Sequence, residues 1–133
     1  MTRKEEEKSL LQRSKNFLET AEFQISRGFY DLAAFSLEQA LQLFLKAKLL
    51  AEGADYPRKH SLRALLKMLS ELVSEDKKSQ VEKVLEDYLL ELGMLEDAYI
   101  TSRYITREFT KEELEKLSKA VKEIMENVTR PNY

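Results

Sequence analysis

The sequence predicts an all-α protein, an up-and-down four-helix bundle with an additional C-terminal helix. Three observations carry this prediction. No stretch alternates apolar and polar residues with the period of a strand, and apolar residues recur at intervals of three and four over most of the 133 residues. One segment is apolar nearly all round, and a bundle of amphipathic helices is the architecture that buries it. We expect one domain over residues 1–133.

The segment 30–51 is predicted to be the central helix. It contains no Gly, no Pro and no β-branched residue, so its helix propensity is high. Such a helix needs neighbours on most sides. Gln39, Gln42 and Lys46 are spaced by three and four, so they form a polar line that either faces solvent or lines a cleft. The apolar positions are 32, 33, 34, 35, 37, 40, 41, 43, 44, 45, 47, 49, 50 and 51.

Two amphipathic helices flank the central one in the chain. The first spans 4–26 and is ended by Gly28, a residue that suits the left-handed position after a helix. The third begins near Ser61, a plausible N-cap, and ends around 74. Between the central and third helices, residues 52–60 form a loop with a stop signal at Gly53.

The remaining chain is predicted to form two more helices. A polar turn over 74–79 leads to a fourth helix over about 80–102, whose outer face is acidic. The last helix opens with a capping box of Thr110 and Glu113 and runs to about 127, before Pro131.

Composition excludes several classes of protein. Cys is absent, which removes disulfides and thiolate chemistry and favours a cytoplasmic location. The N-terminus lacks the apolar run of a signal peptide, and no stretch reaches the roughly 20 apolar residues that span a bilayer. The net charge of −2 provides no global basic field, so nucleic-acid binding would need a local patch. A charged content of 35% is the direction in which thermophile proteins lean.

The usual catalytic and cofactor motifs are missing. There is no Gly-rich phosphate loop and no paired-His zinc motif, so we expect neither a cofactor nor a metal. His60, the single histidine, is the first candidate for proton transfer, although a His beside a helix start commonly bonds the first turn. No catalytic residue is assigned.

Two places could bind phosphate. Arg63 lies one turn from Lys67 in a segment without acidic residues, and the pair could hold a phosphate at the helix start or form a solvated face that balances the acidic fourth helix. Arg103 and Tyr104 directly follow the predicted end of the fourth helix. They could hold a phosphate or stack on a base, or could equally cap the helix carbonyls.

An ordered set of short motifs resembles the HEPN domain family, the higher-eukaryote and prokaryote nucleotide-binding domain. The resemblance covers roughly residues 10–125. The motifs are AEF at 21–23, GFYDLAAF at 28–35, QALQLFLKA at 39–47, Gly53, HSLRALL at 60–66 and YITSRY at 99–104.

The resemblance implies a four- or five-helix bundle, usually a homodimer of archaeal or bacterial origin, often encoded beside a minimal nucleotidyltransferase with which it forms a toxin–antitoxin pair. Some members are metal-independent ribonucleases that carry an Arg followed four to six residues later by a His. Arg103 matches that Arg, but Glu108, Phe109 and Thr110 stand where the His is expected.

The departure from the ribonuclease motif favours a non-catalytic domain that binds nucleotide or RNA and partners a nucleotidyltransferase. Two alternatives stay open: a ribonuclease that uses Arg103 with Glu108 or His60, and a dimeric protein-interaction scaffold. The expected binding residues are Arg103, Tyr104, Gln39, Gln42, Lys46, His60 and Arg63.

Overall fold

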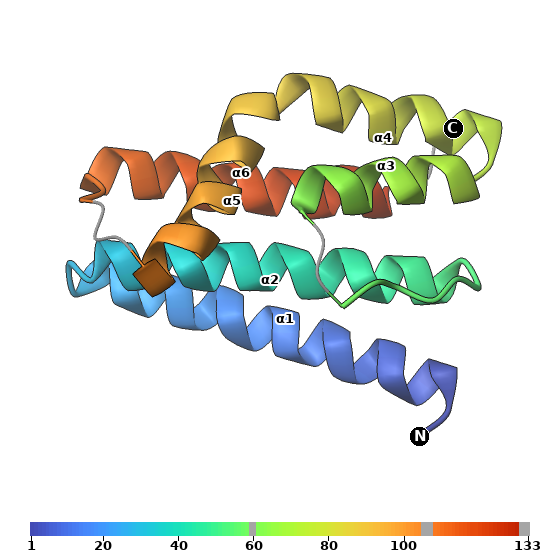
Figure 1. The fold of residues 1–133 in the computed structure, drawn as a ribbon, viewed down its shortest axis with the longest axis horizontal. Coiled ribbons are helices and arrows are strands. Elements are labelled where there is room, and N and C mark those ends of the chain that lie inside the picture. The colour runs from blue at the N-terminus through green and yellow to red at the C-terminus, as the bar shows by residue number, and fades with distance from the viewer. Residues whose placement is uncertain (59–60, 105–107, 131–133) are drawn as a thin grey trace.

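The computed structural model describes residues 1–58, 61–104 and 108–130, and for 101–104 it describes the backbone alone. The described chain is helical, without a strand, and its helices pack as a bundle (Figure 1). The all-α prediction is confirmed. The helices are α1 (Arg3–Ser26), α2 (Tyr30–Ala51), α3 (Leu62–Leu72), α4 (Glu75–Asp87), α5 (Leu89–Tyr104) and α6 (Lys111–Thr129).

Helix α2 is the centre of the bundle, with the bounds that the sequence predicts. It contacts α1, α3, α5 and α6, and 14 of its 22 residues are buried. Two of the buried residues are charged: Glu38 is 2% exposed and Lys46 is 6% exposed. Charged side chains are almost never buried without partners, so these two residues need hydrogen-bonding or charged partners inside the protein.

Three of the signals predicted to begin or end helices are confirmed. Gly28 has a φ of 78°, the left-handed conformation that ends α1 after Ser26. The Ser61 hydroxyl accepts a hydrogen bond from the Ala64 amide at 3.0 Å, so Ser61 is the N-cap of α3. The capping box of Thr110 and Glu113 opens α6, with both reciprocal bonds present.

The prediction of a polar turn over 74–79 is wrong. Only Ser74 lies outside the helix, and α4 begins at Glu75. Glu75 and Asp76 occupy the first turn, where negative charge is favourable next to the exposed amides of a helix N-terminus. The polar residues of this segment therefore form the solvated start of a helix.

The prediction of one continuous helix over about 80–102 is also wrong. The chain breaks at Tyr88, whose φ of −115° and ψ of 23° are not helical. The Tyr88 hydroxyl donates to a Glu123 carboxylate oxygen on α6 at 2.7 Å. After the break, α5 leaves the direction of α4 and descends towards α2 (Figure 1), which it contacts. No Gly or Pro marks this position, so the bend follows from packing on α6 and α2.

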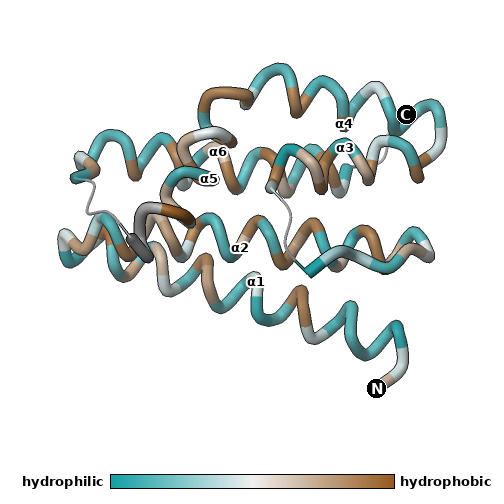
Figure 2. The backbone as a smooth tube through the Cα atoms, viewed as in Figure 1, coloured by the Kyte–Doolittle hydropathy of each residue, from teal (hydrophilic) through white to brown (hydrophobic). Residues whose placement is uncertain are grey.

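The hydrophobic core joins all six helices around α2. Hydrophobic and hydrophilic residues alternate along α6 and α1, as expected for helices that bury one face (Figure 2). Each fully buried Leu contributes about 1.5–3 kcal/mol through removal of its surface from water. The fully buried leucines are Leu37, Leu41, Leu45, Leu49, Leu62, Leu65, Leu66, Leu69, Leu92, Leu95, Leu114 and Leu117.

Across the described residues, none of the helices combines the length and the apolar character that crossing a membrane requires.

Candidate functional site

A pocket of about 290 Å³ lies between α2, α5 and the start of α3. The floor comes from α2 and one wall from α5, while the segment before α3 forms the rim. The pocket combines charged, amide, hydroxyl, aromatic and aliphatic groups, the mixture typical of small-molecule sites. Its lining residues are Glu38, Gln42, Arg58, Ser61, Glu96, Tyr99 and Ile100.

Glu38 forms the polar floor of this pocket. One carboxylate oxygen accepts from the Gln39 side-chain amide and the other from the Gln42 side-chain amide, each at 2.8 Å. Burial raises the pKa of Glu38, and the hydrogen bonds from Gln42 and Gln39 and the charge of Lys46 oppose that rise. Glu38 is therefore a desolvated carboxyl group held by amides, an environment found at sites that bind ligands or move protons.

Lys46 lies on the same face of α2, one turn beyond Gln42 and about two turns beyond Glu38. Its Nζ donates to the Gln42 side-chain oxygen at 2.9 Å and to the Arg58 carbonyl at 3.2 Å, and it lies 5.4 Å from the centroid of the Tyr56 ring. Burial lowers the pKa of Lys46, while the Glu38 charge opposes that fall. The ammonium thus fixes the segment before α3 against α2.

Arg63 and Glu96 close the pocket between α3 and α5. The guanidinium donates through Nε at 2.8 Å and through Nη2 at 3.1 Å to the two carboxylate oxygens, a bidentate pair. The Arg63 backbone amide also donates to Glu96 at 3.3 Å. The Glu96 carboxylate therefore contacts both the Arg63 guanidinium and the N-terminal end of α3, where a negative charge is favourable.

Tyr99 and Ile100 provide the apolar wall. The Tyr99 ring stacks on Phe35 of α2, with 6.1 Å between centroids and 9° between planes. Ile100 is 55% exposed. Arg58, on the rim, is exposed and has no ion-pair partner among the described residues. The pocket thus offers a flat hydrophobic surface on one side and a cation at its mouth.

The structure brings together four of the residues predicted from the sequence. Gln42 lines the pocket, while Gln39, Lys46 and Arg63 bond to its carboxylates or to Gln42. The basic side chains of this group are committed to partners within the protein. His60 and the side chains of Arg103 and Tyr104 lie outside the described residues, although the backbone of 103 and 104 forms the last turn of α5.

Sequence reasoning missed the two carboxylates. The polar line predicted from the sequence runs through Gln39, whereas the hydrogen-bonded line runs through Glu38, Gln42 and Lys46, at intervals of four residues. That spacing was a usable signal, because residues four apart lie on one helix face. Glu96 gave no such signal, because it lies among other acidic residues in the sequence. It reaches α3 only because the chain bends at Tyr88.

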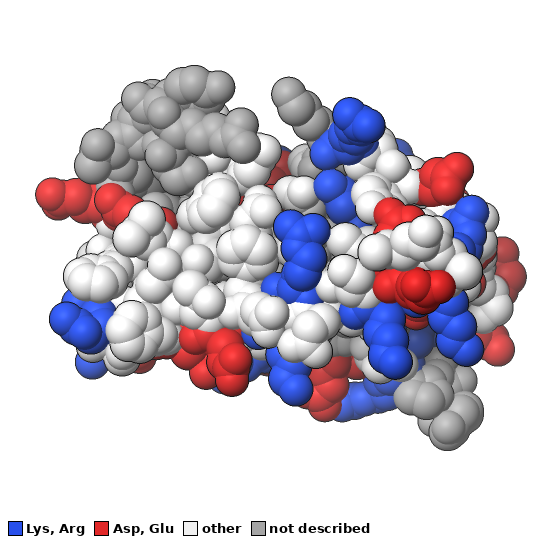
Figure 3. Space-filling view, turned by 90° about the horizontal axis from the view of Figure 1, so that it is seen from below, with Lys and Arg blue, Asp and Glu red and all other residues white. Residues whose placement is uncertain are grey.

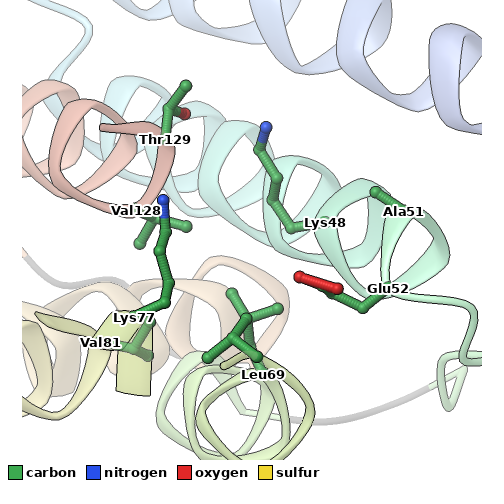
Figure 4. A pocket seen from close by; sticks show the side chains of 9 residues that line it. Lys48, Ala51, Glu52, Leu69, Lys77, Val81, Val128 and Thr129 are labelled. Atoms are coloured by element: carbon green, nitrogen blue, oxygen red, sulfur yellow. The ribbon is translucent and has the colours of Figure 1, made fainter. Parts of the chain in front are cut away.

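A second hollow, of about 180 Å³, lies at the other end of α2. Lys48 from α2 and Lys77 from α4 extend in the same direction there, beside Val128 and Thr129 of α6 (Figure 4). The Lys77 ammonium donates to the Arg130 carbonyl at 2.7 Å. Burial and the nearby Lys48 charge lower the pKa of Lys77. This cation bonds the carbonyl of Arg130, the C-cap of α6, which is a structural role.

The fold and the pocket together define a helical bundle with a polar site between its central helix and a neighbouring helix. The HEPN domain family model matches residues 7–130, so the chain belongs to this helical family of nucleotide-binding and ribonuclease-type domains. Comparisons with curated proteins and with solved structures each found no match.

Proposed function

We propose that this chain is a non-catalytic HEPN domain that binds a nucleotide or RNA in the pocket between α2 and α5, and that it partners a minimal nucleotidyltransferase in a toxin–antitoxin-like pair. The observation that carries the binding proposal is the hydrogen-bonded line of Glu38, Gln42 and Lys46, whose two charged members are buried and of which Glu38 and Gln42 line the pocket. Burying two charges costs several kcal/mol each, a cost that a purely structural helix has no need to bear.

The predicted residues take two roles in this proposal. Gln39, Gln42, Lys46 and Arg63 hold the pocket in shape through the bonds described above. His60, Arg103 and Tyr104 belong to segments that adjoin the lining residues in the chain, and we assign them contacts with the sugar and phosphate, which Arg and Tyr are suited to make.

The three positions where a ribonuclease of this family carries its His support a non-catalytic role. Glu108 is exposed, Phe109 is 7% exposed in the hydrophobic core, and the Thr110 hydroxyl accepts from the Glu113 amide. Two of the three side chains therefore serve the fold. Neither Phe nor Thr transfers protons near neutral pH.

Isothermal titration calorimetry tests the binding proposal. Wild-type protein is titrated with ATP and with a short single-stranded RNA, alongside Arg58→Ala and Arg103→Ala. Arg130→Ala serves as a matched control, since Arg130 pairs with Glu126 away from the pocket. We expect both pocket variants to weaken binding and the control to leave it unchanged. Absence of binding, or binding indifferent to the pocket variants, would contradict the proposal.

A second candidate function is a metal-independent ribonuclease, favoured by one observation. Glu38 is a carboxyl group with a raised pKa that lines a pocket, and such a group is a candidate for proton transfer. An RNA cleavage assay in EDTA separates the two functions. Cleavage that disappears in Glu38→Gln would establish the enzyme, and inertness of the wild type at high protein concentration would exclude it.

We further propose that the chain forms a homodimer, as HEPN domains often do. Exposed apolar side chains surround the turn between α1 and α2: Phe23 at 58%, Phe29 at 46% and Leu32 at 56%. The same end of the molecule presents a broad area without Lys, Arg, Asp or Glu in a chain that is 35% charged (Figure 3). An area of this kind is typical of protein interfaces.

Sedimentation equilibrium of wild type and Leu32→Glu tests the dimer, with Leu72→Glu as the control because Leu72 is similarly exposed on α3. We expect Leu32→Glu alone to shift the mass to the monomer. If both variants keep the dimer, another face forms the interface. A monomeric wild type would overturn the dimer proposal, and the scaffold alternative would then need a different protein partner.

A further inference from the structure

We infer that the pocket between α2 and α5 selects guanine: Glu38 and Glu96 accept hydrogen bonds from the adjacent N1–H and N2–H groups of the base. This inference rests on the proposed function, because it names the base of the nucleotide or RNA that the pocket takes. It rests on the two carboxylates that line the pocket and on the lone-pair positions that their hydrogen bonds leave open.

Several donors around the floor and one wall of the pocket are engaged within the protein. The side-chain amides of Gln39 and Gln42 donate to Glu38, and the Lys46 ammonium donates to Gln42 and to the Arg58 carbonyl. The Arg63 guanidinium donates to Glu96 through two nitrogens. Of the residues that line the floor and the α5 wall, Glu38 and Glu96 carry carboxylates, and Gln42 carries an amide that already bonds Glu38.

The acceptors of the pocket have capacity left. Each carboxylate oxygen has about two lone-pair positions, and the side-chain bonds take one per oxygen in Glu38 and in Glu96. The Arg63 amide takes one further position on Glu96 at 3.3 Å. Two carboxylates with free lone-pair positions therefore line the floor and wall, and donor groups of a ligand can bond to them.

Guanine is the base whose Watson–Crick edge fits these two carboxylates. It carries two neighbouring donors, N1–H and the N2 amine, a pair that matches carboxylate oxygens. Adenine and cytosine each place one amine beside a ring nitrogen acceptor, and uracil places its N3–H between two carbonyl acceptors. Those acceptors would face carboxylate lone pairs without a proton between them, which costs binding free energy.

The remaining walls fit a planar base with its phosphate outside. Tyr99 and Ile100 supply the ring and aliphatic contacts on which a base packs. A phosphate placed beside Glu38 and Glu96 would be repelled, so it lies at the mouth, where Arg58 is exposed. The volume of about 290 Å³ is at the lower end for ligand pockets and admits one base.

Calorimetric titration with GMP, IMP, AMP, CMP and UMP tests the inference. IMP is the matched ligand, because it is GMP without the N2 amine. We expect GMP to bind best and IMP to lose roughly tenfold, the worth of one hydrogen bond to a charged group. The other three should bind more weakly still. Equal affinities for all five would overturn guanine selection and leave the proposed function standing, whereas absence of binding by all five and by short RNA strands would overturn both.

Two further measurements make the test sharper. Glu96→Gln keeps the shape of the side chain, and we expect it to reduce the preference of GMP over AMP, with Glu115→Gln on the exposed face of α6 as the unchanged control. A uridine hexanucleotide and the same strand with one guanosine distinguish RNA from free nucleotide as the source of the base. Tighter binding of the guanosine strand than of GMP assigns the site to RNA, and the reverse assigns it to the nucleotide. Equal preference in wild type and Glu96→Gln would contradict the role of that carboxylate.

Discussion

The carboxylate of Glu38 and the ammonium of Lys46 are connected through one side chain. The Gln42 amide nitrogen donates to Glu38 at 2.8 Å, and its oxygen accepts from Lys46 at 2.9 Å. All three residues lie on one face of the most buried helix. The two charges are thus stabilised by an intervening amide, and removal of that amide leaves each short of a partner.

Gln42→Leu should therefore destabilise the protein by about 2–4 kcal/mol, since each buried polar group left without its partner costs about 1–3 kcal/mol. Urea denaturation measures the change in the free energy of unfolding. The matched control is Gln12→Leu, because Gln12 donates to Asn16 at 3.0 Å on the exposed face of α1. We expect the control to change stability by less than about 0.5 kcal/mol. Similar losses in both variants would contradict the role of Gln42.

The pH dependence of stability should carry a contribution from Glu38. Its folded-state pKa is raised above the ordinary value of 4.5, so the folded protein holds this proton more tightly than the unfolded chain. The contribution is fully present below pH 4.5 and is lost as the pH rises through the folded pKa. Lys46 and Glu96 are the charged groups that act on this carboxyl, and both remain in Glu38→Gln.

Urea midpoints of wild type and Glu38→Gln over a series of pH values measure this contribution. The stability of the wild type relative to the variant should fall as the pH rises above 4.5. A difference that stays constant over the series would show that Glu38 titrates alike in the folded and unfolded states. The lowered pKa of Lys46 acts in a separate alkaline window, where stability rises towards pH 10.5.

The hydrogen bond between Tyr88 and Glu123 should be visible in the titration of tyrosine. This bond raises the pKa of Tyr88 to about 12, with burial as the next cause. Its stabilisation is complete below the ordinary tyrosine pKa of 10.0 and is lost as the pH rises towards 12. Carbon-13 NMR of labelled tyrosine follows each ring separately.

In Glu123→Gln the pKa of Tyr88 should fall towards 10.0, because the carboxylate that accepts the bond is gone. Glu115→Gln, on the same helix, provides the comparison. Stability at neutral pH should fall by about 0.5–1.5 kcal/mol in Glu123→Gln. An unchanged Tyr88 resonance would mean that the bond does not form in solution.

The glycines at 28 and 93 should respond in opposite directions to alanine. Gly28 has a φ of 78°, where an L-residue is strained, so Gly28→Ala should cost about 1–2 kcal/mol. Gly93 lies inside α5 and nothing lies within 4 Å of an added Cβ, so Gly93→Ala should stabilise by about 0.5–1 kcal/mol. Thermal unfolding of the two variants gives the comparison. Destabilisation by Gly93→Ala would indicate that α5 does not stay helical there.

Local signals in the sequence predicted most of the fold. The bounds of α2, the N-cap at Ser61 and the capping box at Thr110 each depend on residues within one turn of the feature, and all three are confirmed. At the break in the helix, Tyr88 bonds Glu123, a residue 35 positions away. Nothing local marks the break, so no reading of neighbouring residues could have predicted it.

The candidate site shows the same division. Gln42 and Lys46 could be found because a polar residue in an apolar helix is conspicuous in sequence. Glu96 could not, because its value as a pocket wall comes from its bond to Arg63 on another helix. Glu38 could have been found from its spacing of four residues to Gln42. The chain has 24 acidic residues, however, and only the burial of Glu38 distinguishes it from the others.

The burial of α2 limits how the pocket can change during evolution. Its floor is part of the helix that contacts four of the other five helices, so a substitution at Glu38 or Gln42 affects ligand preference and folding together. The rim at Arg58 and the wall at Ile100 are exposed. Related chains that bind different ligands should therefore differ first at these outer positions, while the floor stays the same.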